Sequence, residues 1–447
     1  MQFYLFSTVL IGTLAALALR AGALGAEFIF CSSAAAAIGL VCMLRQKNRL
    51  SAEVERGALI ILSASAGLRL ASIVFKNAVR PPEWDFLCYW AYSLASSFNM
   101  PLYETKVSLA QRLPMVPSAE FVTELLGTPF HFPPPAAFLY SWLVAFDFQT
   151  AALVWCLLMF AALLASGWLL TEMFSDNSHS SLLPLTLLLC LGPSAETFAY
   201  CQTNFLLLLC VSIYMLNVRS FAGGALIGFA AVTIKPIAAL FLLFALMKRY
   251  YTPLFGAACM VTVMLVLSSM SYGWSNVLAY FVSDLPSALP SNMYVQEINQ
   301  SLLSASLRLT SYDYVNLSPL FSPAFLGAAF LLTGITLLFA ATCSKQHETR
   351  ALLSVIILAL LCYPGTLTHY SVLLIVPLLY SISKNEKFAP YILVSVLVLT
   401  SIDSWKTGTF TLLLCWGWSI IPFAQMALGH LLGERAERKT SAVLGLN

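Results

Sequence analysis

The sequence predicts an all-α protein, a polytopic bundle of transmembrane helices. Of its 447 residues, 60% are hydrophobic and only 10% are charged, whereas soluble domains carry about 25% charged residues. Apolar runs recur from Phe3 to Leu432, and each is close to the roughly 20 residues that a helix needs to cross a bilayer. Because lipid offers no hydrogen bonds to the backbone, these runs must form helices. We count about 11 to 14 crossings by this length.

The chain reads as one membrane-embedded domain, 1–447, because no linker, repeat or low-complexity tract divides it. The first apolar run, 3–19, lacks a basic segment before it and a small-residue cleavage site, so we expect a retained helix rather than a signal peptide. Together with the run 27–44 it predicts a helical hairpin within residues 1–56. Residues 433–447 are expected to form a cytoplasmic tail.

Basic residues predict which loops face the cytoplasm. They occur in five groups: Arg45, Lys47, Arg49 and Arg56; Lys248 and Arg249; Lys345 and Arg350; Lys384 and Lys387; and Arg435, Arg438 and Lys439. By the positive-inside rule these groups mark the inner side. The polar loops near 78–135, 271–320, 366–370 and 403–408 then share the outer face. Between Ala136 and Phe205 the apolar runs are short and uneven, so we expect a re-entrant segment there.

The first outer loop, 78–135, opens with two carboxylates, Glu83 and Asp85, next to the end of a span. Asp85 is surrounded in sequence by aromatic residues, among them Tyr89, and partial desolvation would make its carboxylate a better base. A general base is one use of such a group. The alternative is a solvated carboxylate or one paired with Arg80. Glu83 is a candidate second carboxylate or metal ligand.

The same loop contains two further features. Residues 87–98 have apolar side chains at helical spacing, which predicts a short helix lying in the membrane interface, and a second such stretch begins near Ser118. The loop closes with His131 in a run of aromatic residues followed by three prolines, which impose extended backbone. Such a run would hold aromatic rings at the membrane surface. It also fits an ordinary helix start with an interfacial aromatic belt.

Polar residues interrupt later apolar runs at two places. Gln202 and Asn204 precede the run 205–216, where their amides would bind sugar hydroxyls or Asn204 would cap the helix. Lys235 lies inside the run 223–247 and is followed by Pro236, which breaks a helix. An intramembrane Lys is costly and is usually functional or paired. We expect two short helices to meet at Lys235, where the ammonium contacts an anionic lipid headgroup, snorkels or is paired within the membrane.

The second outer loop, 271–320, contains Asn299 and Gln300 and then Arg308, whose guanidinium has the fork geometry that binds phosphate. An Arg at the rim of an interfacial helix is the alternative. His369 lies between two apolar runs, where an imidazole would orient a phosphate, transfer a proton or simply end a helix. No Cys/His spacing typical of a metal site occurs, so we predict no metal ligand set.

Taken in order, these elements resemble the GT-C integral-membrane glycosyltransferases, and among them glycosyltransferase family 87, which uses polyprenol-phosphate sugars. The resembling elements are Trp84-Asp85-Phe86 with Tyr89 and Ala91; Pro101-Leu102-Tyr103; Phe130-His131-Phe132-Pro133-Pro134; Gln202-Thr203-Asn204; Gly224 to Lys235-Pro236; Asn299-Gln300-Ser301-Leu302 with Arg308; and His369-Tyr370. They span roughly 80 to 380. Each element is short, so the specificity lies in their order.

The resemblance implies a GT-C fold and an inverting transfer of a sugar, mannose above all, from a polyprenyl-phosphate donor to a hydroxyl of a lipid or glycan acceptor. It implies that Asp85 is the catalytic base and that Lys235, Arg308 and His369 contact the donor phosphate. The chain departs from the family in three ways. The aromatic-Pro-Pro element has His131 and Phe132 where Tyr is usual, the N-terminal hairpin is additional, and Glu83 leaves a divalent metal open, although we do not favour one.

Two other classes compete with this interpretation. A secondary transporter or flippase for a lipid or glycan would also suit a broken helix at Lys235, and a ligase using a diphosphate-linked glycan is the third. The sequence has no detectable halves, which a transporter would show, and no large late loop rich in Arg and His, which a ligase would show. We expect no nucleic-acid partner and no bound cofactor, and we place the protein in the bacterial inner membrane with its site facing the periplasm.

Overall fold

The computed structural model describes residues 23–47, 49–79, 86, 89, 90, 132–174, 181–284, 294–310, 318–384, 386, 389–400 and 405–427. These residues form helices and connecting turns with no β-strand, which confirms the all-α prediction. Within the described ranges the one isolated β-bridge pairs Asn299 with Leu367. Its place in the site is described below.

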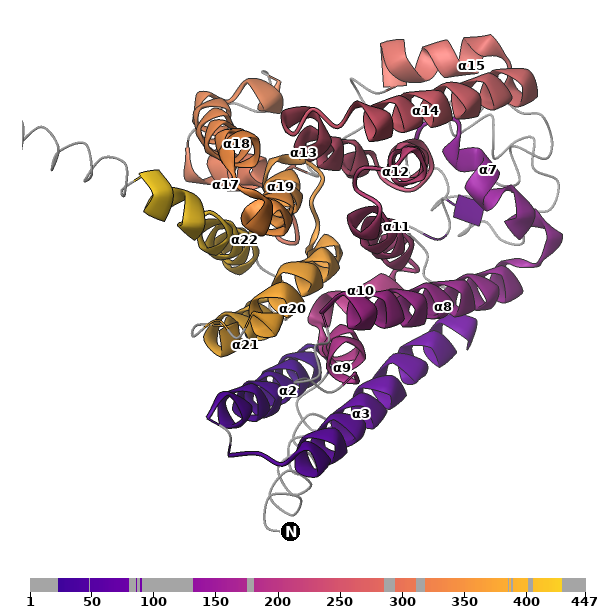
Figure 1. The fold of residues 1–447 in the computed structure, drawn as a ribbon. Helices are drawn as coiled ribbons and strands as arrows, with labels where there is room; N and C mark the ends of the chain where they lie inside the picture. The colour runs from indigo at the N-terminus through magenta and orange to yellow at the C-terminus, as the bar shows by residue number, and fades with distance from the viewer. Residues whose placement is uncertain are drawn as a thin grey trace, which may run out of the picture.

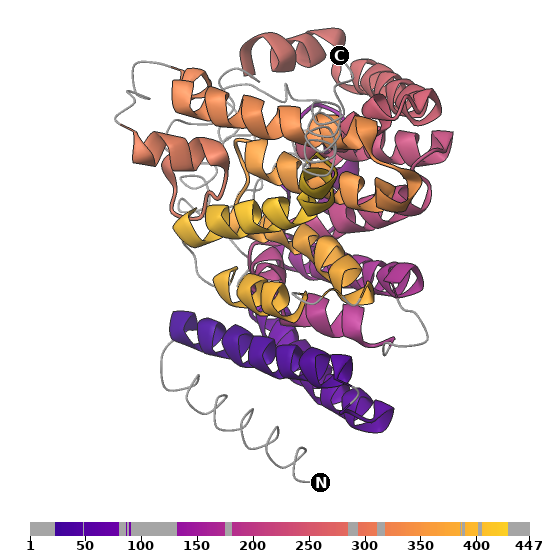
Figure 2. The ribbon, with the colours of Figure 1, turned by 60° about the vertical axis from the view of Figure 1, so that its left-hand side comes forward.

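The N-terminal part contains two long helices and then a series of uneven ones. They are α2 (Ala23–Gln46), α3 (Ala52–Val79), α7 (Ala136–Tyr140), the 3₁₀ segment η1 (Ser141–Ala145), α8 (Phe148–Phe174), α9 (Leu183–Cys190) and α10 (Gly192–Ala199). Helix α8 is long enough to span, whereas α7, α9 and α10 are short, which confirms the expected unevenness between Ala136 and Phe205. Helix α2 packs against α21 (Ala389–Leu399), far along the chain (Figure 1, Figure 2).

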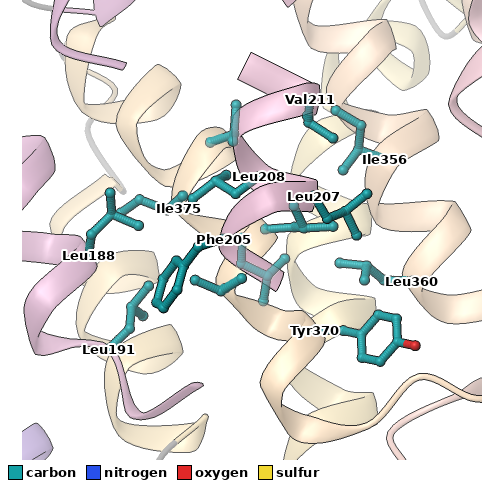
Figure 3. Packing of buried hydrophobic residues seen from close by; sticks show 14 of the residues in the cluster. Leu188, Leu191, Phe205, Leu207, Leu208, Val211, Ile356, Leu360, Tyr370 and Ile375 are labelled. Carbon is teal, nitrogen blue, oxygen red and sulfur yellow. The ribbon is translucent and has the colours of Figure 1, made fainter. Parts of the chain in front are cut away.

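The central part is built around α11 (Asn204–Leu216), which lies near the middle of the molecule in Figure 1. Its sequence is apolar on every side, and a helix of that kind is buried all round. Figure 3 shows Leu207 and Val211 directed toward Ile356 and Leu360, while Phe205 lies near Leu188. The remaining central elements are α12 (Phe221–Thr233), η2 (Pro236–Phe241), α13 (Leu242–Met247), α14 (Tyr251–Tyr272), α15 (Trp274–Ala279) and η3 (Tyr280–Asp284).

Helices α12 and α14 cross closely because glycines line their contact. A Cβ on Gly224 would lie 1.8 Å from the Pro253 carbonyl oxygen, and one on Gly228 would lie 2.6 Å from the Ala257 carbonyl oxygen. A Cβ on Gly256 of α14 would likewise lie 2.2 Å from the Phe221 carbonyl oxygen. Small residues at such spacing let two membrane helices pack backbone to backbone. These glycines are therefore packing residues of the bundle.

The C-terminal part completes the bundle with one long helix, α18, and several shorter ones. They are α17 (Leu302–Leu309), η5 (Pro319–Phe321), α18 (Pro323–Thr342), η6 (Lys345–His347), α19 (Glu348–Cys362), η7 (Thr368–Leu374), α20 (Ile375–Ser383), α21 and α22 (Trp405–Ser419). Helix α19 contacts α18, α22 and η2, and η7 contacts α10 and α11. The segment that contains His369 is thereby packed into the centre of the molecule.

Long spans are fewer than the sequence predicts. The described residues contain five helices long and apolar enough to cross a membrane, or six if the bent pair 406–419 and 421–427 counts as one span. Five further apolar helices have only 10–17 residues. The expected 11 to 14 crossings are not reached by long helices alone, because several apolar runs are broken, as at Lys235-Pro236. The first expected span, 3–19, lies outside the described residues.

Most of the basic loops lie at one end of the bundle. Arg350 pairs with Glu386 at 2.7 Å, and the Glu386 carbonyl accepts a hydrogen bond from Gln46. Near the start of α19, Glu348 pairs with Arg219 at 2.7 Å. Lys248 donates to the Cys343 carbonyl at 2.8 Å. These contacts join loops that the positive-inside rule assigns to one side, so the predicted grouping is confirmed for them.

The α12–α14 crossing predicts the cost of added volume. We expect Gly224→Ala to lower the free energy of unfolding by about 1–3 kcal/mol, because the new methyl group would overlap the Pro253 carbonyl and the two backbones must separate. The measurement is thermal unfolding of the purified protein in detergent. Gly327→Ala is the control, since a Cβ at Gly327 meets nothing within 4 Å. Equal melting temperatures for both variants would contradict the close crossing.

Candidate functional site

The site begins at a break between two short helices. Helix α12 ends at Thr233, Lys235 is extended (φ −155°, ψ 129°), and η2 starts at Pro236. Proline disfavours helical backbone in the residue before it and cannot donate to the helix itself. This confirms the predicted break. Only 3% of Lys235 is exposed, its ammonium donates to Gln202 Oε1 at 3.0 Å, and it lies 3.6 Å from the centre of the Tyr370 ring.

Gln202 joins this ammonium to the first outer loop. Its Oε1 also accepts a hydrogen bond from the Tyr89 hydroxyl at 3.2 Å. A tight turn orients the Gln202 side chain. Cys201 has a left-handed backbone (φ 50°), and the backbone N–H of Gln202 donates to the Thr197 carbonyl at 2.8 Å. Three distant parts of the sequence therefore meet at one amide group.

Asn204 is the first residue of α11 rather than its cap. The residue before the helix is Thr203, which makes no side-chain capping bond. Asn204 Nδ2 donates to Thr197 Oγ1 at 3.1 Å, while its buried Oδ1 accepts no hydrogen bond from the described residues. The capping role considered for Asn204 is therefore wrong. Its side chain instead braces the turn on which Gln202 sits.

The second outer loop is joined to the segment that follows Pro364. The Asn299–Leu367 bridge aligns them, Gln300 N–H donates to the Thr366 carbonyl at 2.8 Å, and Asn299 Nδ2 donates to the Pro364 carbonyl at 2.9 Å. The polar loops that were predicted to share one face therefore meet. Asn299 uses its amide within this junction.

Gln300 is fully buried and connects three segments. Its Oε1 accepts from the Ser371 hydroxyl at 2.7 Å, and its carbonyl accepts from the Thr409 hydroxyl at 2.9 Å. The side chain lies against Gly408, where a Cβ would stand 2.2 Å from Gln300 Cδ. Its Nε2 is buried without a partner among the described residues. Gln300 thus holds the His369 segment in place.

His369 is the least satisfied group in the site. Only 2% of it is exposed, and neither ring nitrogen has a hydrogen-bond partner in the described structure. Its ring is stacked on Tyr370, with centroids 5.3 Å apart, and lies 6.3 Å from the Tyr200 ring. Buried polar groups are nearly always hydrogen-bonded in native proteins, so we expect water or a bound molecule to contact these two nitrogens.

Arg308 is held by its own loop. It lies in the last turn of α17, where it pairs with Glu297 at 2.8 Å and donates to the Val295 carbonyl. These contacts orient the guanidinium toward residues 295–297. The structure places Arg308 at the end of α17 in the loop 271–320.

Asp85, Glu83 and His131 lie outside the described residues, but their neighbours show where the first outer loop meets the bundle. The Tyr89 ring is stacked on Tyr140 with centroids 4.4 Å apart, and it also contacts the rings of Phe132 and Trp155. Phe86 packs on Phe148 at 5.5 Å. Phe86 and Tyr89, which lie close to Asp85 in sequence, are therefore buried packing residues.

The helices that position the polar groups are too short to cross the hydrocarbon core. Helices α11 and α12 have 13 residues each, which corresponds to about 20 Å of rise against a core of about 30 Å. One end of each lies beside the basic loops at Arg219, and the other end carries Gln202 or Lys235. The polar cluster is therefore recessed by about 10 Å if the basic end lies at the membrane boundary.

Two residues of the site, Tyr370 and Gly408, were not among the predicted site residues. Tyr370, whose ring faces the Lys235 ammonium, gave a weak signal because it adjoins His369. Gly408 gave none, since a single glycine near the start of an apolar run does not reveal that Gln300 packs against it. In the part of the chain that the structure describes, no three His, Cys, Asp or Glu side chains gather as a metal site would require.

Comparison with known proteins identifies the family. The model of glycosyltransferase family 87 matches residues 130–364, more than half of the chain, so the protein belongs to this GT-C-type family. The matched region includes Gln202, Lys235 and Arg308, whereas Asp85 and His369 lie outside it. No curated protein and no solved structure matches the chain.

The Gln300 junction yields a prediction. Gly408→Ala should displace the Gln300 side chain, break its bond to Ser371 and shift the His369 segment. We expect a loss of stability of about 1–3 kcal/mol, as for other overpacked cores, together with reduced glycosyl transfer. The control is Gly417→Ala in the same helix, because a Cβ at Gly417 meets nothing within 4 Å. Unchanged melting and turnover in Gly408→Ala would refute the role of the junction.

Proposed function

We propose that this glycosyltransferase moves mannose from a polyprenyl-phosphate-linked donor to a hydroxyl of a lipid or glycan acceptor, with inversion at the anomeric carbon. The observation that supports this most is that Lys235 and His369 both contact the Tyr370 ring, at the end of the short helices that carries the polar groups. A buried ammonium stacked on Tyr370, close to an imidazole with two unpartnered nitrogens, offers charge and hydrogen bonds to a phosphate.

A lipid-linked donor suits a recessed site. The isoprenoid tail of such a donor stays in the hydrocarbon, so its phosphate approaches the polar cluster from within the membrane. Helices α11 and α12 are shorter than the hydrocarbon core is thick, so with their basic ends at one membrane boundary the cluster lies at the depth of the lipid. The sequence also carries none of the glycine-rich phosphate loops of soluble nucleotide-binding enzymes.

The mechanism we propose is a single displacement. The acceptor oxygen attacks the anomeric carbon while the bond from that carbon to the phosphate oxygen breaks, and the Asp85 carboxylate takes the acceptor proton. The electron pair of the broken bond leaves with polyprenyl phosphate. Lys235, His369 and Arg308 would stabilise the growing negative charge on that phosphate. One displacement inverts the configuration at the anomeric carbon.

The remaining polar residues would orient the sugar and the acceptor. Gln202, Asn204, Asn299 and Gln300 are buried at the meeting of the polar loops, so any of their free hydrogen-bonding atoms would face a bound hydroxyl. In the described structure Asn299 and Gln300 chiefly hold the loops together, which favours an indirect role for both. His131 and Glu83 are proposed to line the acceptor side.

The protein is an integral membrane protein, and we propose that its site faces outward across the bacterial inner membrane. The basic loops contact one another at one end of the bundle, and the polar cluster lies at the opposite ends of α11 and α12. The positive-inside rule would then place the cluster on the periplasmic side. Membership of a glycosyltransferase family favours an enzyme over the secondary transporter or flippase.

The proposed base predicts a defined kinetic defect. We expect Asp85→Asn to lower kcat by about 10²- to 10⁴-fold, the usual contribution of general-base catalysis, with donor affinity unchanged. Transfer of labelled mannose from polyprenyl-phosphate-mannose by the purified variants measures this. Asp147→Asn is the control, since the hydrogen bonds of that exposed carboxylate stay local to Thr150. Turnover by Asp85→Asn at the wild-type rate would remove the proposed role.

The proposed phosphate contact predicts a different defect. Lys235→Met should raise the dissociation constant of the lipid-phosphate donor about 10- to 100-fold, because a hydrogen bond to a charged group contributes about 1.5–3 kcal/mol. Acceptor affinity should change little. The matched control is Lys248→Met at the far end of the segment η2–α13, where the ammonium donates to the Cys343 carbonyl. Equal loss of donor and acceptor binding would point to a structural role.

A further inference from the structure

We infer that Gln202 is a positioning residue: its side-chain amide holds the first outer loop in register with Lys235. This inference rests on the proposed function for its catalytic meaning. It concerns the placement of two groups from distant segments, one near the proposed base and one at the proposed phosphate contact. Its structural core is the double hydrogen bond at Gln202 Oε1.

The two hydrogen-bond donors, Lys235 and Tyr89, fix the orientation of the Gln202 side-chain amide. A lysine ammonium can only donate hydrogen bonds, so the Gln202 atom 3.0 Å from Lys235 Nζ must be the oxygen. The Tyr89 hydroxyl lies 3.2 Å from the same oxygen and therefore donates to it as well. Both lone-pair directions of Oε1 are then used. Substrate hydroxyls can reach Gln202 only as acceptors of its Nε2–H groups.

Neighbouring contacts make this amide a rigid reference point. The Trp155 indole donates to the Cys201 carbonyl at 2.7 Å, and the same ring packs against Tyr89 with centroids 5.9 Å apart. Only 5% of Gln202 is exposed. One tryptophan thus supports both the turn that aims Gln202 and the tyrosine that bonds to it.

The consequence concerns the geometry of transfer. Tyr89 follows Asp85 by four residues, so the hydrogen bond to Gln202 fixes a residue close in sequence to the proposed base relative to Lys235. In a displacement the base and the phosphate contact act on opposite sides of the anomeric carbon, and small misplacement of either lowers the rate. Loss of the amide should therefore affect kcat more than donor affinity.

The test compares Gln202→Leu, Gln202→Glu and Tyr89→Phe in the full-length protein. We expect Gln202→Leu to lower kcat by about 10- to 100-fold, the range for a lost hydrogen bond to a charged group, with a smaller change in donor KM. Gln202→Glu keeps an oxygen that accepts from Tyr89 and Lys235 but loses the N–H groups. This variant should retain the loop anchor while raising the KM for the sugar donor, because a carboxylate would face the phosphate of that donor.

Trypsin cleavage of the first outer loop gives a readout that needs no donor. Lys106 and Arg112 are the basic residues between Arg80 and Pro133. Loss of one anchoring hydrogen bond should speed cleavage there about fivefold in Gln202→Leu and Tyr89→Phe. Gln202→Glu and the exposed control Gln346→Leu should cleave at the wild-type rate.

The outcomes separate the inference from the proposed function. Wild-type cleavage in Gln202→Leu and Tyr89→Phe overturns the inference, as does faster cleavage in Gln202→Glu. A defect of Gln202→Leu confined to KM also overturns it, because it would make Gln202 a substrate contact alone. If wild-type protein transfers no sugar from a polyprenyl-phosphate donor, the proposed function fails while the cleavage result still decides whether Gln202 anchors the loop.

Discussion

The burial of the Lys235 ammonium is the constraint on which the rest of the site depends. A charged side chain within an apolar bundle is costly unless it is paired, and here the Gln202 oxygen and the face of Tyr370 surround it. Each of these partners requires its own backbone irregularity. Gln202 needs the left-handed turn at Cys201, and Tyr370 needs the break after Pro364. The breaks in the central helices place both partners against the Lys235 ammonium.

The same irregularities explain why short helices occupy the centre while long ones surround them. Helices α3 and α8 have 28 and 27 residues and form part of the outer frame, whereas α11 and α12 stop at the polar cluster. The close α12–α14 crossing fixes the direction in which α12 delivers Lys235. A rigid apolar frame thus holds a recessed polar end, which fits the lipid-linked donor that we propose for this glycosyltransferase.

Much of this could be predicted from composition and single residues. The all-α fold follows from apolar runs, and the break at Lys235 follows from a Lys-Pro pair inside such a run, because both features are local. The described residues contain five or six long spans and five shorter apolar helices, a division that the sequence does not reveal, since hydropathy does not register where an apolar run bends. The Asn204 cap was wrong because its side chain donates to Thr197, seven residues earlier.

The Gln300–Gly408 contact and the Arg308–Glu297 pair depend on how segments meet and leave little trace in the sequence. The positions of Asp85, Glu83 and His131 remain predictions.

The decisive measurement is donor selection by the purified wild-type enzyme. Membranes containing acceptors would be supplied in parallel with labelled polyprenyl-phosphate-mannose, polyprenyl-phosphate-arabinose and the corresponding nucleotide sugars. The phosphate site proposed at Lys235 and His369 predicts labelled product from a polyprenyl-phosphate donor, mannose above all, and none from a nucleotide sugar. Transfer from a nucleotide sugar with no transfer from either lipid-linked donor would contradict the proposed function.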